Sequence, residues 1–393
     1  MPIPPLYTSS AGDFRSDTFT IPTKDFWSQV TDASLGDTIN LEDTDTCSLE
    51  ARLSDEILGG RVHSGEKSEG LFCMSTTLAN QIAVRSHLNF APPYSVLCDK
   101  RAHIFVDECA GIAVLSQALV MPTMASNGCY LTLEDIKENY VPDIGDIHLA
   151  PTRLICLENT LHGMLFPLTE LQRISDWAHS QDIKIHLDGA RLWNAAAATA
   201  AANNSSSEFE TEIEYMQKVS KLVDSVSICL SKSIGAPIGS VLVGSSQFIK
   251  KARHIQKQQG GGIRQAGFIT KIANYCIDLN FPNRIVEVNK ATSRFWTDLF
   301  HTLKDQYQFE LVLQHPVETN FIFVDLAKSK ISLKLLLEFA EKNNVRLWDG
   351  RLAFHYQNID QEGLDRLKQT FIDIAKYYKE HPYVAEERSA RIY

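Results

Sequence analysis

The sequence predicts an α/β protein, with a mostly parallel sheet in a large domain and a smaller α+β domain at the C-terminus. From about residue 36 to residue 270, short apolar runs alternate with longer amphipathic stretches, which is the pattern of strand–helix units. From about residue 271 onward, a long helical pattern is followed by a few strands and then by helices. A chain of 393 residues with 44% hydrophobic content can bury one large core or two unequal ones.

Five apolar runs of the first region are predicted to be strands, because each is short and is stopped by a polar residue or glycine. They are YSVLCD (94–99), RLICLE (153–158), IKIHLD (183–188), SVSICLS (225–231) and GSVLVG (239–244). Residues 168–182 have apolar positions at helical spacing and are predicted to form the crossover helix before IKIHLD. In the alanine-rich run 195–212, the alanines should continue a helix and the Asn/Ser cluster should end it in a surface loop.

Three parts of the chain are expected from these patterns. Residues 1–35 form an N-terminal arm that leads into a helix near Asp25, residues 36–270 form the large domain, and residues 271–393 form the C-terminal domain. The last part is predicted to contain strands at 321–326 and 345–348.

The composition excludes several classes of protein. A net charge of −10 argues against nucleic-acid binding, which requires a basic surface. The eight cysteines are scattered, without C-x-x-C or metal-ligand spacing, so we expect reduced thiols and no metal site. No secretion signal and no apolar run of membrane-spanning length is visible, and a cytoplasmic location is expected.

The most informative residues are Asp188, which ends one predicted strand, and Lys232, which follows another. Open α/β sheets bind ligands beyond the carboxyl ends of their strands. Pyridoxal phosphate needs a carboxylate that keeps its ring nitrogen protonated and a lysine that holds its aldehyde as an imine. Asp188 and Lys232 suit these two roles. The alternative is a solvated surface lysine and an aspartate that caps a helix.

Longer motifs around these residues resemble a known family. HLDGARLWNAA (186–196), ICLSKSIGAPIGSVLVG (228–244) and KQQGGGIRQAG (257–267) are similar to the threonine aldolases, and to fungal low-specificity members in particular. The likeness extends through nearly the whole chain, including DFRSDTFTIPT, LFCMSTTLANQIA, RAHIFVDECAG, DIHLAPTRLICLENTLHG and GRLAFHYQ. It implies a fold type I enzyme with pyridoxal 5'-phosphate as cofactor, in which Lys232 forms the Schiff base.

The resemblance also implies the other cofactor contacts. His103 should stack on the pyridine ring, and Asp188 should pair with the ring nitrogen. Thr76 and Thr77 should lie in the phosphate loop, where backbone N–H groups at a helix start bind the anion. Arg264 resembles an arginine that reaches the phosphate of a neighbouring subunit, which implies a homodimer or homotetramer with shared active sites.

The substrate contacts are implied in the same way. Arg191, Ser16 and Arg351 match residues that bind the substrate carboxylate, a task to which the guanidinium geometry is suited. His148 matches a histidine near the substrate hydroxyl. His103 and His148 could instead be core histidines with satisfied hydrogen bonds.

The chain departs from the family pattern around the expected pocket. Where members usually have GDDVYGED, this chain has GDTINLED (36–43), with Asn40 for tyrosine and Leu41 for glycine. Thr76 replaces another glycine, and Asp107 stands where an aromatic residue or histidine is common. Leu41 and Thr76, in place of two glycines, should shrink the pocket and exclude a β-hydroxy substrate.

The first prediction for the reaction is therefore racemisation of a small amino acid. The chain would be an alanine racemase that supplies D-alanine to a fungal cyclic-peptide pathway, similar to racemases built on the threonine aldolase scaffold. The alternative is a low-specificity L-threonine aldolase, which cleaves L-threonine and L-allo-threonine to glycine and acetaldehyde. A non-catalytic paralogue is the third possibility, and the retained Lys232 and Asp188 argue against it.

Overall fold

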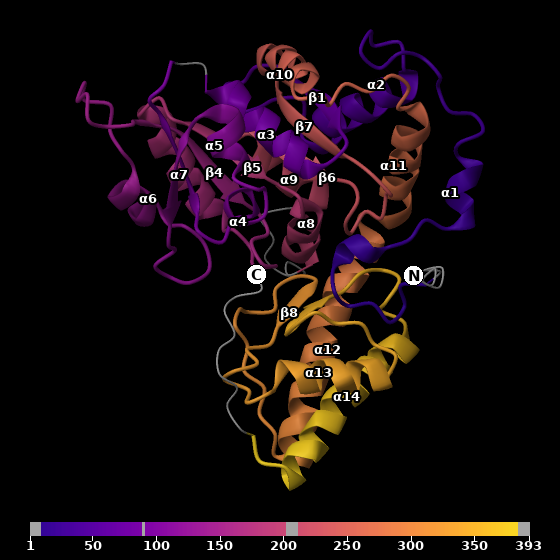
Figure 1. Cartoon of the computed structure of the whole chain (residues 1–393). Coiled ribbons are helices and arrows are strands. Elements are labelled where there is room, and N and C mark those ends of the chain that lie inside the picture. Colours follow the sequence, from indigo (N-terminus) through magenta and orange to yellow (C-terminus); the bar gives the residue numbers. More distant parts are fainter. Residues whose placement is uncertain (1–8, 89–90, 202–210, 384–393) are drawn as a thin grey trace, which may run out of the picture. The chain divides into compact units, whose positions relative to one another are not determined.

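The computed structural model describes residues 9–88, 91–201 and 211–383 (Figure 1). By its internal contacts the chain divides into two compact units, Pro22–Asn283 and Met1–Ile21 with Arg284–Tyr393. The N-terminal segment thus belongs to the same unit as the C-terminal part of the chain. The predicted domain boundaries at residues 35 and 270 stay a prediction.

The unit Pro22–Asn283 is built on a seven-stranded sheet in the order β1-β7-β6-β5-β4-β2-β3. Only β7 runs antiparallel to its neighbours, so the sheet is mostly parallel, as predicted. The strands are β1 (Ser68–Cys73), β2 (Ser95–Asp99), β3 (Leu119–Thr123), β4 (Thr152–Glu158), β5 (Lys184–Asp188), β6 (Ser225–Cys229) and β7 (Ser240–Ser245). All five strands predicted in this region are confirmed, whereas β1 and β3 were not predicted.

Helices pack on the strands of this sheet, and every residue of β2 and of β6 is buried as a result. The predicted crossover helix is α7 (Leu168–Ser180), which packs against β5. The helix α3 (Thr76–His87) lies against β4 to β7, and α10 (Ser246–Gln258) lies against β1 and β7. The remaining helices are α1 (Lys24–Ser28), α2 (Thr44–Ala51), α4 (His103–Val106), α5 (Gly111–Ser116), α6 (Leu133–Asn139), α8 (Leu192–Ala201), α9 (Glu212–Ser220) and α11 (Gly267–Asn280), with a π-helical turn at Arg52–Ile57.

Two local predictions can be followed in this unit. The helix near Asp25 is confirmed as α1, and the alanine run forms the end of α8. The Asn/Ser cluster (203–207) that was predicted to form a loop lies outside the described residues. No helix in the described part of the chain is long and apolar enough to cross a membrane.

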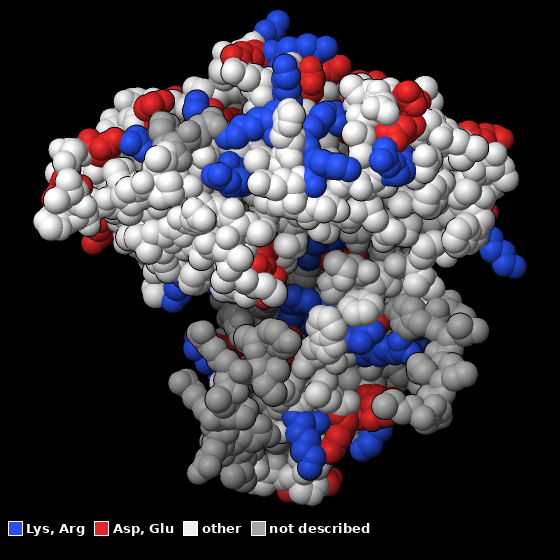
Figure 2. Space-filling model, turned by 45° about the horizontal axis from the view of Figure 1, so that its top comes forward, with Lys and Arg blue, Asp and Glu red and all other residues white. Residues whose placement is uncertain are grey.

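Charged side chains of both signs lie on the surface of this unit. Figure 2 shows Lys and Arg gathered around α10, with Asp and Glu on either side of them. The visible face thus presents a mixed charge pattern rather than a continuous basic stripe, in keeping with the net charge of −10.

The second unit combines the N-terminal segment with a small α+β structure. It contains α12 (Asn283–Tyr307, which starts at the unit boundary), α13 (Leu333–Lys342), α14 (Gln361–Glu380) and the antiparallel pair β8 (Phe321–Phe323) and β9 (Arg351–Ala353). Phe14 is fully buried in its core and packs edge-on against Phe354 at 5.4 Å between ring centroids. This contact explains why the N-terminal segment belongs to the unit.

The predicted strand at 345–348 is wrong. Arg346 makes only an isolated bridge with Asp13, because the N-terminal segment pairs with it at a single position. The strand of this region is β9 instead, five residues farther on, where it pairs with β8. The predicted strand at 321–326 is confirmed in its first half as β8.

Candidate active site

The two residues singled out by the sequence lie at the same edge of the sheet. β5 and β6 are parallel neighbours, β5 ends at Asp188, and Lys232 follows the end of β6 by three residues. The backbone turns there, since the Lys232 carbonyl accepts a hydrogen bond from Gly235 N at 2.8 Å. Asp188 is 5% exposed. A buried carboxylate and a lysine therefore meet at the carboxyl edge of the sheet, where α/β proteins bind ligands.

Asp188 is held by two donors. Its Oδ1 accepts from the backbone N–H of Ala190 at 2.9 Å, and its Oδ2 accepts from Nδ2 of Asn80 at 2.7 Å. Asn80 lies on α3 and is completely buried. Its Nδ2 also donates to Oε1 of Glu108 at 2.9 Å, so one amide group bridges two carboxyl groups.

His103 begins the short helix α4 beside this pair. Its Nδ1 lies 2.9 Å from Oε1 of Glu108, whose side chain is fully buried, and this hydrogen bond raises the pKa of His103. The negative charge of Asp188 adds to the rise, and the positive charge of Lys232 opposes it. The ligand atoms of His103, Glu108 and Asp188 all lie within 4.8 Å of one another. With Nδ1 bound to a carboxylate, Nε2 is the ring nitrogen left for other partners.

Glu158 brings a further carboxyl group to the same edge. It ends β4 directly beside Asp188 in the register of the sheet, and its Oε2 accepts from the backbone N–H of His103 at 2.9 Å. Burial, followed by repulsion from Asp188, raises the pKa of Glu158 to about 7. The positive charges of His103 and Lys232 act in the opposite direction. Glu158 is therefore poised to gain or lose a proton near neutral pH.

The start of α3 has the features of a phosphate site. Ser75 caps this twelve-residue helix, with its Oγ accepting from Leu78 N at 3.1 Å. The hydroxyl of Thr76 is buried and has no hydrogen-bond partner among the described residues. Helix starts present free N–H groups to anions, and Asn80 lies about 6 Å along the axis from Thr76. The orphaned hydroxyl and the helix start thus fit the phosphate of pyridoxal phosphate, while Asp188 and Lys232 fit its ring and aldehyde.

The other predicted residues of this unit lie in different surroundings. Arg191 is half-buried at the start of α8, three residues after Asp188, where its carbonyl accepts from Asn194 N at 2.9 Å. Thr77 follows Thr76 in the first turn of α3. His148 is exposed, and its backbone N–H donates to Oδ1 of Asp146 at 2.8 Å. Among the described residues, the His148 side chain makes no hydrogen bond with His103, Asp188 or Lys232.

Arg264 is bound to the segment in which the chain departs from the family pattern. Its guanidinium lies 2.8 Å from Oδ2 of Asp37 and lowers the pKa of that carboxyl group, and its carbonyl accepts from Thr38 N at 2.6 Å. Its side chain is nevertheless 66% exposed.

Asn40 and Leu41 belong to the segment expected to exclude a β-hydroxy substrate. Both side chains are exposed in the unit Pro22–Asn283, so they do not narrow a pocket there. Leu41 has a φ of 60°, a conformation that suits the glycine of the family pattern better than leucine. Asp107, the other departure, is also exposed and ends α4. Thr76, the remaining substituted residue, has a buried hydroxyl without a hydrogen-bond partner among the described residues.

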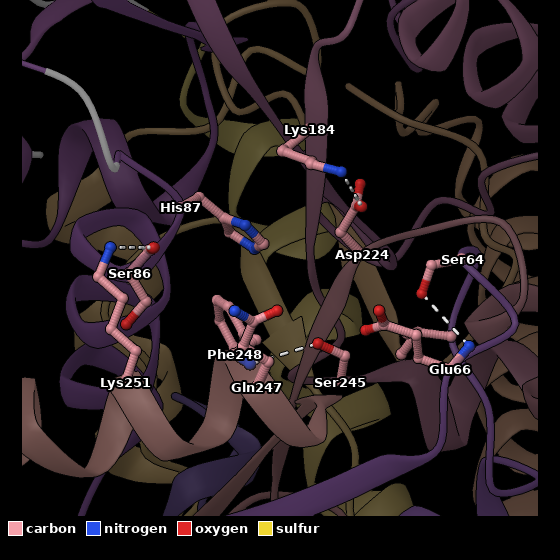
Figure 3. Close-up of a pocket in the computed structure, with 11 residues that line it drawn as sticks. Ser64, Glu66, Ser86, His87, Lys184, Asp224, Ser245, Gln247, Phe248 and Lys251 are labelled. Carbon is pink, nitrogen blue, oxygen red and sulfur yellow. Dashed lines mark hydrogen bonds and ion pairs between the residues drawn. The ribbon is translucent and has the colours of Figure 1, made fainter.

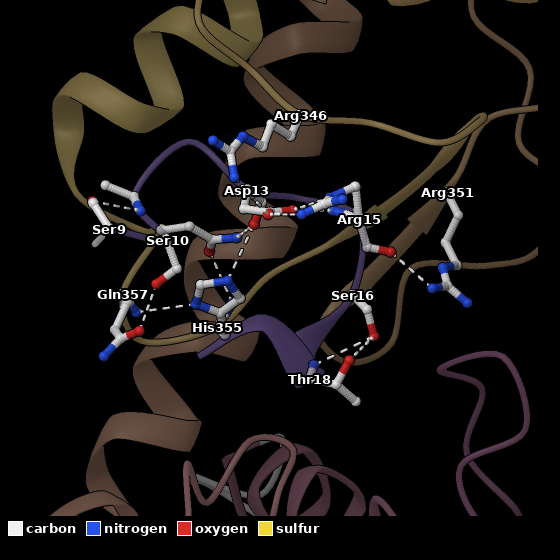
Figure 4. A network of polar contacts seen from close by, with 12 residues as sticks. Ser9, Ser10, Asp13, Arg15, Ser16, Thr18, Arg346, Arg351, His355 and Gln357 are labelled. Atoms are coloured by element: carbon white, nitrogen blue, oxygen red, sulfur yellow. Dashed lines mark hydrogen bonds and ion pairs between the residues drawn. The ribbon is translucent and has the colours of Figure 1, made fainter. Parts of the chain in front are cut away.

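Ser16 and Arg351 belong to the other unit, where they lie in a network of polar contacts (Figure 4). The Ser16 hydroxyl accepts from Thr18 Oγ1 at 3.0 Å, and Arg351 Nη2 donates to the Arg15 carbonyl at 2.7 Å. Their shared role at the substrate carboxylate stays a prediction.

Comparison with known proteins agrees with this site. A family model described as beta-eliminating lyase matches residues 13–329. A low-specificity L-threonine aldolase of Eremothecium gossypii is 45% identical over 98% of this chain and 92% of its own length. An alanine racemase, TOXG of Cochliobolus carbonum, is 32% identical over 94% of this chain and 88% of its own.

The chain belongs to the threonine aldolase family. Enzymes of this family depend on pyridoxal phosphate, and the chain is an enzyme of that kind. A solved threonine aldolase of Leishmania major has the same fold, with a TM-score of 0.69 at 20% identity over 92% of this chain and 99% of its own. The fold type I architecture predicted from the sequence is confirmed.

Four polar residues in or next to this site were not predicted: Asn80, Glu108, Glu158 and His186, whose Nε2 lies 3.1 Å from Oδ1 of Asn80. Glu158 could have been found by the argument used for Asp188, because both end a predicted parallel strand. Asn80 and Glu108 lie in family motifs whose letters do not reveal their contacts. His186 is an interior residue of β5, and no local pattern distinguishes it from an ordinary buried residue.

Glu158 yields a prediction for stability. Its pKa of about 7 in the folded protein exceeds the ordinary value of 4.5, so its ionisation opposes folding. The stability that neutral Glu158 contributes is complete below about pH 4.5 and is lost as the pH rises through about 7. We expect Glu158→Gln to be more stable than the parent by roughly 1–3 kcal/mol at pH 8, and by nothing measurable at pH 4.5.

Urea unfolding of the cofactor-free protein at a series of pH values measures this difference. Glu134→Gln, which removes an exposed carboxylate, serves as the control. A difference between Glu158→Gln and the parent that is equal at both pH values would contradict the prediction.

Proposed function

We propose that the chain is a low-specificity L-threonine aldolase, which cleaves L-threonine and L-allo-threonine to glycine and acetaldehyde. The observation that carries this proposal is the similarity to an enzyme of that name along nearly the whole chain, 45% against 32% for the alanine racemase. The argument for racemisation was a pocket narrowed by Leu41 and Thr76 in place of two glycines. Leu41 is exposed, and the buried Thr76 hydroxyl lies at the start of α3, where we place the cofactor phosphate. The alternative of the sequence analysis therefore replaces its first choice.

The residues of the site divide the task as follows. When bound, pyridoxal phosphate supplies an electron sink for the bond that breaks at Cα. Lys232 would hold its aldehyde, and the buried carboxyl group of Asp188 would keep a proton on the ring nitrogen. His103, whose orientation is fixed by Glu108, would contact the ring, and the start of α3 with Thr76 and Thr77 would bind the phosphate.

The substrate must be held by its carboxylate and must lose its hydroxyl proton. We assign the carboxylate to Arg191, Ser16 and Arg351. A base has to accept the β-hydroxyl proton as the Cα–Cβ bond breaks, and we assign this role to His148.

The test is an assay of the purified protein with added pyridoxal phosphate. We expect glycine and acetaldehyde from L-threonine and from L-allo-threonine. L-alanine in deuterated water should stay L-alanine, without D-alanine in chiral analysis. Formation of D-alanine without cleavage of L-threonine would instead establish the racemase.

We also propose that the enzyme is a homodimer or homotetramer whose active sites are shared, because Arg264 is exposed and matches a residue that reaches a neighbouring subunit. Sedimentation at assay concentration should give a mass of two or four chains, and a fully active monomer would refute the proposal.

We also propose a cytoplasmic location, because the eight free cysteines suit the reducing environment of the cytoplasm. Fluorescence imaging of the tagged protein can test this location.

A further inference from the structure

A chain of buried hydrogen bonds leads from Asp188, between α3 and the face of the sheet, to the opposite edge of the sheet. It starts at Asn80, whose Oδ1 lies 3.1 Å from Nε2 of His186 on β5. Nδ1 of His186 lies 2.8 Å from the hydroxyl of Ser225 on β6, which in turn lies 2.7 Å from Nε2 of His87. We call these four residues the Asn80 relay: Asn80, His186, Ser225 and His87.

The relay is built from one helix and two strands. Asn80 and His87 are seven residues apart on α3, which places them two turns apart on the same face. His186 and Ser225 are register neighbours on β5 and β6, against which α3 packs. Asn80, His186 and Ser225 are completely buried, and His87 is 8% exposed.

The outer end of the relay borders a cavity of about 400 Å³ (Figure 3). His87 lies in its wall, near Lys184 at the start of β5 and Asp224 just before β6. The cavity is therefore at the amino edge of β5 and β6, opposite the edge where Asp188 and Lys232 lie. Phe248 stacks on the His87 ring at 4.4 Å and fixes its plane.

The hydrogen-bond partners determine the direction of every donor. Both protons of Asn80 Nδ2 go to carboxyl groups, Asp188 at 2.7 Å and Glu108 at 2.9 Å. Its Oδ1 must then accept, from Ser227 Oγ at 2.7 Å and from Nε2 of His186. A neutral His186 with its proton on Nε2 accepts at Nδ1 from Ser225, whose oxygen accepts from His87. Each hydrogen bond between relay residues is thus donated in the direction of Asn80, which in turn donates to Asp188 and Glu108.

Burial keeps both rings neutral, as this arrangement requires. It lowers the pKa of His186 to about 4 and that of His87 to about 3. Aligned donors in a buried chain polarise one another and strengthen the bond at the end of the chain. That bond is the one from Asn80 to Asp188.

We propose that the Asn80 relay positions Asp188 and Glu108 relative to each other and stabilises the ionised form of Asp188 that the cofactor ring requires. Asn80 is a positioning residue in this role, because it acts through the two carboxyl groups. One amide fixes Asp188, which would pair with the ring nitrogen, and, through Glu108, the imidazole ring of His103. The proposal rests on the role assigned above to Asp188.

The test compares three variants with the parent as cofactor-loaded proteins, without substrate. Asn80→Ala removes the donor to both carboxyl groups, and Ser225→Ala interrupts the relay at its centre. Ser240→Ala is the matched control, because Ser240 is an equally buried serine on the adjacent strand β7 and donates to the Ile228 carbonyl instead. The measurements are the dissociation constant of pyridoxal phosphate and the pH at which the visible absorbance of the bound cofactor titrates.

We expect Asn80→Ala to weaken cofactor binding at least about tenfold, which equals about 1.4 kcal/mol. Its titration midpoint should rise by about one pH unit, because a less protonated ring repels the proton of the Lys232 imine less. Ser225→Ala should change both quantities in the same direction by about threefold and about half a unit. Ser240→Ala should match the parent.

The proposal is overturned if loaded Asn80→Ala has the pyridoxal phosphate affinity and the titration midpoint of the parent. It is also overturned if Ser225→Ala and Ser240→Ala change these two quantities equally. If Asn80→Ala does not fold, parent-like values in Ser225→Ala alone are sufficient to overturn it. A parent protein without visible absorbance would instead refute the proposed cofactor chemistry. The choice between cleavage and racemisation does not enter, since no substrate is present.

Discussion

Lys232→Ala should abolish the visible absorbance of the bound cofactor and lower kcat for L-threonine by at least about 10³-fold, which equals about 4 kcal/mol of transition-state stabilisation. The physical reason is that alanine has no amine to hold the cofactor aldehyde, while Asp188 and the start of α3 still bind the ring and the phosphate. Cofactor affinity should therefore fall far less than kcat. The absorbance spectrum and the rate of acetaldehyde release measure the two effects on one preparation.

Two further variants separate the imine from the positive charge. Lys232→Arg retains a cation but cannot form an imine, and it should be as inactive as Lys232→Ala. Lys100→Ala removes an exposed lysine that follows β2 at the same edge of the sheet, and it should leave spectrum and rate unchanged. A Lys232→Ala variant that keeps both the spectrum and full activity would show that another lysine binds the cofactor.

The sequence predicted the part of the fold that rests on short-range patterns. Buried parallel strands such as β4 and β5 are continuous apolar runs ended by a carboxylate, so their type and bounds are visible in the sequence. The edge strand β3 is partly exposed and contains Pro122, and neither feature marks a strand. The N-terminal segment joins the C-terminal unit through Phe14 and Arg346, and contacts between such distant residues have no local signal.

The residues of the candidate site also fall into those with a local sequence signal and those without one. Asp188 and Lys232 were found because their chemistry and their places at strand ends both point to one cofactor. Asn80 and His186 act through bonds between α3 and the sheet, 106 positions apart in the chain. Such partners follow from how the helix packs on the strands, which one sequence does not specify. The orientation of Asn40 and Leu41 was missed for a similar reason, because the loop conformation that exposes them depends on Arg264 and Asp37.

Asp188→Asn tests the electrostatics of the site more directly than any other change. Asparagine keeps the shape of the side chain and removes the negative charge, so it cannot hold the proton on the ring nitrogen. We expect kcat for L-threonine to fall about 10³-fold and cofactor affinity to fall about tenfold or more. The matched control is Asp99→Asn, because Asp99 ends β2 with the same 5% exposure but is paired with Arg101 at 2.7 Å.

The same variant should also shift two neighbouring titrations. The negative charge of Asp188 contributes to the raised pKa of His103 by attraction and to that of Glu158 by repulsion. Both pKa values should therefore fall in Asp188→Asn, and the proton should leave His103 at a lower pH than in the parent. Imidazole resonances of the cofactor-free protein, followed by NMR across pH 5 to 9, measure this shift for His103. In Asp99→Asn the His103 titration should be unchanged. An Asp188→Asn variant with parent-like cofactor affinity and an unshifted His103 titration would mean that Asp188 is neither the partner of the ring nitrogen nor the charge that acts on His103.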